Sequence, residues 1–129
     1  MDIKMPEMKK TILVYGLSSA EQSKLKQLAD KAGIVCKFVL DTQTTYPISK
    51  LLYTDNLPAG PFHHIPGKFA LMDGFAGEEY LGAAMINKAA AGVIKASHTL
   101  HNGSWPFADL CTAILMEHQS MNNLNSDKK

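Results

Sequence analysis

The sequence predicts an α+β domain of the ferredoxin-like class, because the chain nearly repeats itself. Residues 11–21 match residues 69–79 with an offset of 58, and Gly16 falls on Gly74. After one residue of slippage at a glycine, residues 32–38 match residues 90–96, which places Lys37 on Lys95. Each copy is typical of a strand, a glycine exit, a helix, a glycine stop and a second strand, which together form a βαβ unit.

Two such units interleaved in one sheet give the ferredoxin-like architecture, with four antiparallel strands and two helices on one face. A small doubly wound α/β sheet is the alternative, since the alternation of strands and helices does not separate the two. We favour the first because the chain contains four good strands and they pair off as a repeat.

The first unit, residues 11–40, contains signals for each of its elements. Residues 12–17 form an apolar strand, and Ser19 followed by Gln22 resembles a capping box for a helix that Gly33 ends. Residues 34–40 then alternate as a half-covered strand does. The side chains expected on the core face are Ile34, Cys36, Phe38 and Leu40, and those expected on the second face are Val35, Lys37 and Val39.

A short helix is expected next within residues 44–53, with a cap at Thr44 and Pro47 in its first turn. Three prolines and two glycines in residues 56–67 indicate an exposed loop. The second unit, residues 69–99, repeats the pattern with a strand over 69–75, a helix over 78–91 and a strand over 93–99. A last amphipathic helix begins around Pro106, with an inward stripe at Phe107, Leu110, Cys111, Ile114, Leu115 and His118.

Length and composition indicate one domain over residues 11–118, between a flexible N-terminus (1–10) and a flexible tail (119–129). No apolar run approaches the ~20 residues that span a bilayer, and the first ten residues lack the apolar core of a signal peptide. We therefore expect a cytoplasmic protein that does not bind membranes. Cys36 and Cys111 are expected to be buried, reduced thiols. All thirteen basic residues are lysines, and the absence of arginine argues against nucleic-acid recognition.

The segment after the last strand combines the one tryptophan with an Asn-Gly turn, in the order Lys95, Ala96, Thr99, Asn102 and Trp105. Together with the Asp73-Gly-Phe exit, this segment resembles a bacterial family known as domain of unknown function thirty-seven eighty-three. The resemblance spans residues 11–118 and includes a middle helix at 47–52. It implies no activity, because none is assigned to the family. His98, Leu100, His101 and Pro106 depart from the family pattern, so a function shared by the family would not depend on these histidines.

The candidate chemistry favours a protein that is not an enzyme. His98 and His101 with Asp73, or His63 with His64, are conceivable metal ligands. The repeat instead places His98 at a strand end on the same face as Ile94 and Ala96, and the adjacent histidines lie in an exposed loop. No nucleophile elbow or nucleotide fingerprint is present. We expect no metal and no cofactor.

The sequence leaves two functions open. The first is association, as a homodimer or with a protein partner, through a sheet face or edge whose residues include Lys37, Val39, Lys95 and Ser97. The second is small-molecule binding, with or without catalysis, in a pocket formed by Lys95, Thr99, Asn102 and Trp105. In both cases we expect the Trp105 ring to be buried and to anchor the last helix. The last helix either covers the second sheet face or leaves it free.

Overall fold

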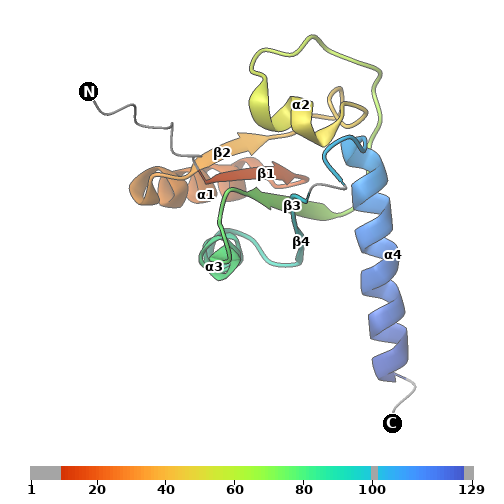
Figure 1. The fold of residues 1–129 in the computed structure, drawn as a ribbon. Helices are drawn as coiled ribbons and strands as arrows, with labels where there is room; N and C mark the ends of the chain where they lie inside the picture. Colours follow the sequence, from red (N-terminus) through yellow and green to blue (C-terminus); the bar gives the residue numbers. More distant parts are fainter. Residues whose placement is uncertain (1–9, 100–101, 127–129) are drawn as a thin grey trace.

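The structure is a computed structural model that describes residues 10–99 and 102–126. It contains one four-stranded sheet with the strand order β2-β1-β3-β4, and Figure 1 shows its helices around this sheet. The elements in chain order are β1 (Thr11–Tyr15), α1 (Ser19–Ala32), β2 (Val35–Phe38), α2 (Ile48–Tyr53), β3 (Lys68–Asp73), α3 (Glu79–Ala89), β4 (Val93–Ser97) and α4 (Phe107–Ser126).

The α+β class is confirmed, but the two βαβ units lie side by side instead of interleaved. β1 pairs in parallel with β2, β3 pairs in parallel with β4, and the two units meet where β1 runs antiparallel to β3. The sheet is therefore mixed, and neither the all-antiparallel sheet that we expected nor a doubly wound parallel one. A helical crossover lets two consecutive parallel strands become direct neighbours. Each unit therefore forms its own parallel pair, and the two pairs meet along β1 and β3.

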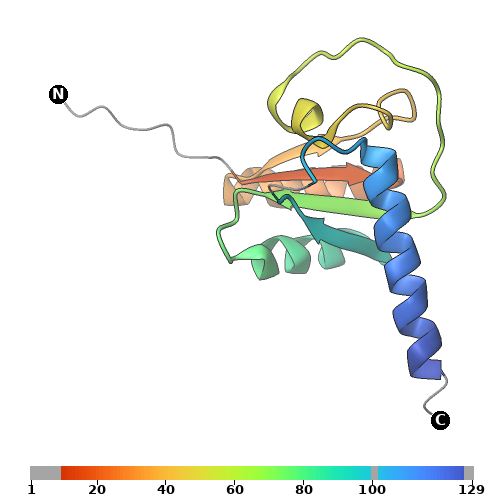
Figure 2. The ribbon, with the colours of Figure 1, turned by 45° about the vertical axis from the view of Figure 1, so that its right-hand side comes forward.

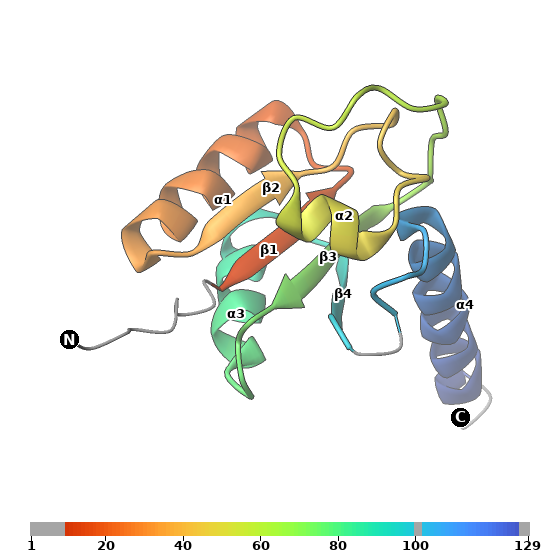
Figure 3. The ribbon, with the colours of Figure 1, turned by 45° about the horizontal axis from the view of Figure 1, so that its top comes forward.

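Helices cover both faces of the sheet, and Figure 3 shows α1 and α3 on the side of the sheet away from α2. The core under α1 and α3 contains Ile12, Val14, Leu25, Phe75 and Ile86. The core on the other face contains Leu13, Ile48, Phe69, Leu71 and Phe107. The last helix thus does cover the second face, and it does so together with α2. A free sheet face is not available for docking.

The ends of the elements differ from the prediction by local chemistry. The N-cap of α1 is Ser18, whose hydroxyl accepts the Glu21 N–H while the Glu21 side chain accepts the Ser18 N–H. Gly33 ends this helix in the left-handed region, as expected. Thr44 does not cap α2, because its hydroxyl donates to the carbonyl of His63 at 2.9 Å. Leu40 lies past the end of β2 and is exposed, not in the core.

Only the first part of α4 packs on the body. Phe107, Leu110 and Cys111 are buried, whereas His118, which we expected in the same stripe, is exposed. Figure 2 shows the helix running on past the sheet, and it continues to Ser126 through most of the tail expected to be flexible. Each further helical residue adds one backbone hydrogen bond, so an established helix extends beyond its packed turns.

Candidate interaction site at the open sheet edge

The strand order makes β2 and β4 the two edges of the sheet. At the start of β2 and directly after its end, the N–H groups of Val35 and Val39 donate to the carbonyls of Lys10 and Val14 at 2.9 and 2.8 Å. Backbone groups alternate in direction along a strand, so Cys36 and Phe38 direct their N–H and C=O groups away from β1. No described residue makes a backbone hydrogen bond to them on that outer side. This is the open edge.

The β4 edge is partly closed by side chains. The His98 N–H donates to the Met72 carbonyl at 2.8 Å, so Val93 and Ser97, at odd positions, direct their carbonyls outward. The Lys95 ammonium donates to the Val93 carbonyl at 3.1 Å, and the Asn102 amide donates to the Ser97 carbonyl at 3.1 Å. The carbonyls of Val93 and Ser97 are therefore occupied within the chain, on either side of the outward carbonyl of Lys95.

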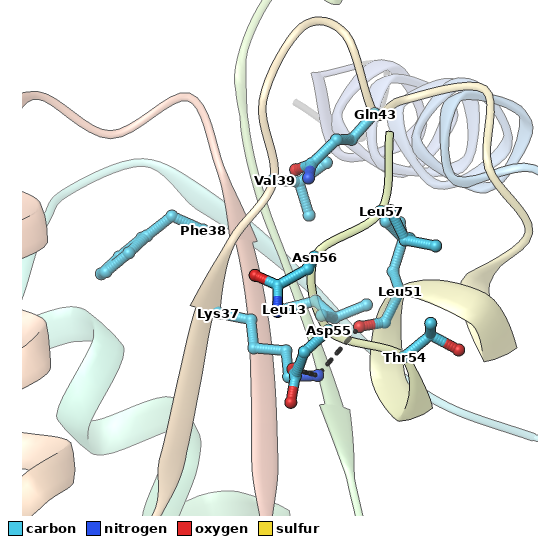
Figure 4. Close-up of a pocket in the computed structure, with 10 residues that line it drawn as sticks. All are labelled: Leu13, Lys37, Phe38, Val39, Gln43, Leu51, Thr54, Asp55, Asn56 and Leu57. Atoms are coloured by element: carbon cyan, nitrogen blue, oxygen red, sulfur yellow. Dashed lines mark hydrogen bonds and ion pairs between the residues drawn. The ribbon is translucent and has the colours of Figure 1, made fainter. Parts of the chain in front are cut away.

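Lys37 is the one charged side chain of β2, and it does not guard the β2 edge. Its ammonium donates to the Leu52 and Leu51 carbonyls at 2.9 and 3.3 Å and pairs with Asp55 Oδ1 at 3.0 Å. Figure 4 shows the side chain lying toward the end of α2 and Asp55. An edge lysine normally discourages strand pairing by remaining in solvent beside the backbone. Here the positive charge caps the C-terminus of α2 instead.

A hollow lies on each face beside β2. The hollow on the α2 side, drawn in Figure 4, has a volume of about 170 Å³, with Leu13, Val39 and Leu51 among its apolar lining residues and Gln43 and Asn56 among its polar ones. The hollow on the α1 side has a volume of about 340 Å³ and is lined by Lys26, Asp30, Gly33, Ile34, Val35 and Cys36. The two hollows are referred to below as the α2-side and α1-side hollows.

Each hollow contains one acid and one base, and the two groups contact each other. In the α2-side hollow these are Lys37 and Asp55, with N–O separation 3.0 Å. In the α1-side hollow these are Lys26 and Asp30, with N–O separation 3.6 Å. The hollows are therefore close to neutral, and neither presents an uncompensated charge to a ligand.

Beyond the β2 edge, the loop before β3 is tied to the sheet by Tyr15, at the carboxyl end of β1. The buried Tyr15 hydroxyl donates to Asp41 Oδ1 and accepts the Ile65 N–H at 2.9 Å, and His64 Nδ1 lies 3.2 Å from the same hydroxyl. Burial, reinforced by the Asp41 bond, raises the pKa of Tyr15 to about 12. The hydroxyl bond in turn lowers the pKa of Asp41. His64 itself is largely exposed, as the sequence predicted for this loop.

A second polar cluster occupies the corresponding end of the other unit, where the sequence predicted only a packed histidine. Asp73 is buried, and its Oδ1 lies 2.8 Å from His98 Nδ1 while its Oδ2 accepts the Tyr53 hydroxyl at 3.2 Å. Burial and the Asp73 charge raise the pKa of Tyr53. Asp73 and His98 were both named from the sequence, but Tyr53 was missed because α2 reaches the site only in the folded chain. His101 lies outside the described residues.

The four residues expected to share one interface do not do so. Lys37 and Val39 lie on the face covered by α2, and Val39 is buried there. Lys95 and Ser97 lie on β4 at the opposite edge, and they alternate with Ile94 and Ala96, which pack on the α2 face. Thr11 pairs with Val35 but its equivalent Phe69 pairs with Ile94, so the second strands repeat with an offset of 59 and not 58. One residue of slip turns every side chain to the other face.

The expected ligand-binding residues are partly brought together. Thr99 and Asn102 close a turn on each other, with the Thr99 N–H donating to Asn102 Oδ1 at 2.9 Å and the Asn102 N–H to Thr99 Oγ1 at 3.2 Å. Lys95 is occupied at the β4 edge. Trp105 is 43% exposed and does not fill the core as predicted. Phe107, two residues later, takes the buried position instead.

The two cysteines agree with the prediction in part. Cys111 is buried, Cys36 is partly buried, and neither forms a disulfide. Burial raises the pKa of both thiols to about 12, which makes them poor nucleophiles.

Comparisons with protein-family models, with curated proteins and with solved structures found no match for this chain. The resemblance to the uncharacterised bacterial family therefore stays a prediction. Within residues 10–99 and 102–126, no helix is long and apolar enough to cross a membrane. The same residues contain no group of three or more acidic, histidine or cysteine side chains placed to hold a metal ion.

Proposed function

We propose that this chain is a cytoplasmic association module that pairs with another polypeptide segment through the backbone of β2. The carrying observation is the difference between the two sheet edges. Two outward carbonyls of β4 are occupied by Lys95 and Asn102, whereas no described residue occupies the outward donors and acceptors of Cys36 and Phe38 on β2. An added strand would satisfy these groups, which is how sheet edges commonly bind extended segments.

Two features support a site at this edge. The Lys37 side chain is folded away, so no charge from β2 lies along its outer backbone. The hollows on both faces offer room for the side chains of an added strand, which alternate between faces. The sheet faces themselves do not support docking, because helices cover them.

Proline substitution at equivalent positions of the two edges tests this proposal. Cys36 and Lys95 occupy the same place in the two units, because Cys36 pairs with Ile12 and Lys95 with the equivalent Ala70. Each directs its N–H outward, so proline removes an outer donor while the ladder to the inner strand is kept. The probe is a displayed library of random peptides selected on the wild-type chain. We expect Cys36→Pro to weaken the selected peptides about tenfold, and Lys95→Pro to leave them unchanged.

Equal binding by the wild-type chain and a folded Cys36→Pro variant would overturn the proposal. Amide shifts of Cys36 and Phe38 on peptide addition give a measurement that does not depend on the variant folding. Binding that leaves those two amides unmoved would also place the contact elsewhere.

The Asp73–His98 pair favours a second candidate function, acid–base chemistry on a small molecule. Because the carboxylate accepts from Nδ1, the proton of neutral His98 is held there and the lone pair is left on Nε2. Nε2 faces Gly103, where an added Cβ would lie only 2.8 Å from it. An alanine at position 103 would therefore press on Nε2 and obstruct any ligand that reaches this nitrogen.

A titration of wild-type and Gly103→Ala protein with phosphate, acetate and citrate, followed by the ring signals of His98, tests this candidate. We expect a saturable shift in the wild type that the alanine abolishes. A His98 ring that responds to none of the three anions, or responds equally in both proteins, would leave the pair with a structural role.

A further inference from the structure

We infer that the partner segment at β2 is extended and uncharged, with β-branched side chains at positions i and i+3. This inference rests on the proposed function and adds the chemistry of the partner. It follows from where the two hollows lie along the strand, which faces they occupy and how their charges are paired.

The two hollows lie at different positions along β2. The α1-side hollow lies beside Ile34, Val35 and Cys36, and the α2-side hollow lies beside Lys37, Phe38 and Val39. Their centres are thus about three residues apart along β2, on opposite faces of the sheet. Side chains of a strand alternate between faces, so two positions on opposite faces are separated by an odd number of residues. A separation of three satisfies both conditions, and separations of two or four do not.

The charged side chains of both hollows are paired. The ammonium of Lys37 is compensated by Asp55, and that of Lys26 by Asp30. A charged side chain entering either hollow would lose hydration without finding an unpaired counter-charge, which is costly. An uncharged side chain avoids this cost.

The size of the α2-side hollow suits a small branched side chain. A cavity of ~150 Å³ takes up a molecule as large as benzene, so the α2-side hollow of about 170 Å³ has room for a valine or threonine side chain. The side chains of Leu13, Val39 and Leu51 give this hollow an apolar part. β-Branched residues also favour the extended backbone that pairing with β2 requires. A second copy of β2 fits less well, because its own side chains are already packed beneath its own helices.

The test uses a short serine-rich peptide with two valines at i and i+3, and an isomer of the same composition with valines at i and i+2. Binding to the full chain is followed through the Cys36 and Phe38 amides. We expect the i, i+3 peptide to bind about tenfold more tightly than its isomer, since the isomer places both valines on one face. Replacing either valine of the first peptide by aspartate should weaken binding by a similar factor.

An Asp55→Asn variant tests whether paired charges exclude a charged side chain, because it leaves Lys37 without its carboxylate partner in the α2-side hollow. We expect this variant to recover most of the affinity for the aspartate peptide directed at that hollow. The matched Asp30→Asn variant should do the same only for the peptide with aspartate at the other position.

Equal affinity of the two valine isomers, with Cys36 and Phe38 amides still shifting, would overturn the spacing and leave the proposed function intact. Sedimentation that shows a dimer of the chain abolished by Cys36→Pro would have the same consequence, because a second copy would then occupy the edge. Peptide binding that bypasses both amides would overturn the proposed function itself.

Discussion

The two βαβ units share a pattern of strand, helix and strand, yet they finish their edge strands in opposite ways. The second unit turns Lys95 and Asn102 onto two outward carbonyls of β4, those of Val93 and Ser97. The first unit turns Lys37 inward onto the C-terminus of α2 and leaves the outer backbone of β2 open. The comparison shows that an edge is guarded by where a polar side chain makes its hydrogen bonds, and not by the presence of that side chain in the sequence.

Among the polar contacts, the largest effect is expected at Asn102, which holds two backbone groups at the β4 edge. Asn102→Ala removes the donor to the Ser97 carbonyl and the acceptor of the Thr99 N–H, and Asn102 itself is buried. Two orphaned groups should lower the free energy of unfolding by about 2 to 4 kcal/mol, measured by denaturant melts. Sedimentation should also show concentration-dependent association through the newly open β4 edge. Asn102→Asp is the control, since it keeps the acceptor and loses only the donor, and an alanine variant as stable as the wild type would contradict the comparison.

A smaller effect is expected on the open side. Lys37→Met keeps the apolar stem of the side chain but removes the donor to the Leu51 and Leu52 carbonyls. Its free energy of unfolding should fall by about 1 to 3 kcal/mol in the same melts. Asp55→Asn removes only the ion pair with a largely exposed carboxylate, and should cost less than about 1 kcal/mol. If the two variants were equally destabilised, the ion pair and not the helix cap would be the main role of Lys37.

The polar clusters at the carboxyl ends of β1 and β3 can be distinguished by the pH dependence of stability. Because the Tyr15 hydroxyl holds the pKa of Asp41 down, Tyr15→Phe should raise that pKa toward its ordinary value, as followed by carboxyl carbon NMR. A carboxyl whose pKa is lowered by folding stabilises the protein above its unfolded pKa, and that contribution is lost as the pH falls. The variant should therefore lose less stability on acidification. Tyr53→Phe, which acts on Asp73 in the other unit, should leave Asp41 unchanged.

At alkaline pH, the Tyr15 hydroxyl makes the stability fall as the pH rises. Folding raises the pKa of Tyr15 from 10.0 to about 12, so the native state keeps a proton that the unfolded chain releases. Stability should consequently fall as the pH rises between these two values, and Tyr15→Phe should flatten this part of the curve. An unchanged slope in the variant would mean that other groups carry the alkaline transition.

A small effect is expected at Trp105, whose ring the sequence predicted to be buried. With 43% of the residue exposed, Trp105→Ala should cost about 1 kcal/mol, whereas the fully buried Phe107→Ala should cost about 3 to 5 kcal/mol. Paired denaturant melts measure the difference. A tryptophan variant as unstable as the phenylalanine variant would restore Trp105 as the anchor of α4.

The candidate site could be predicted only in part. Lys37, Lys95 and Ser97 lie on edge strands and Val39 directly follows one, but the expectation of one shared surface was wrong. The 58-residue offset that describes β1 and β3 becomes 59 at β2 and β4. The sequence shows a slip at the glycine, but the match of Lys37 with Lys95 favours an offset of 58 in the second strands as well. The slip decides which face each lysine occupies.

The sequence by itself determined the elements, their order and the two βαβ units, because apolar periodicity, glycine stops and caps are interactions between residues a few positions apart. The tertiary structure alone decided that the units lie side by side, that α2 and α4 cover the second face, and that Lys37 meets the end of α2. These outcomes depend on contacts between segments distant in sequence. No local pattern records them, since the same side chain can cap a helix or guard an edge depending on which backbone carbonyl the fold brings within its reach.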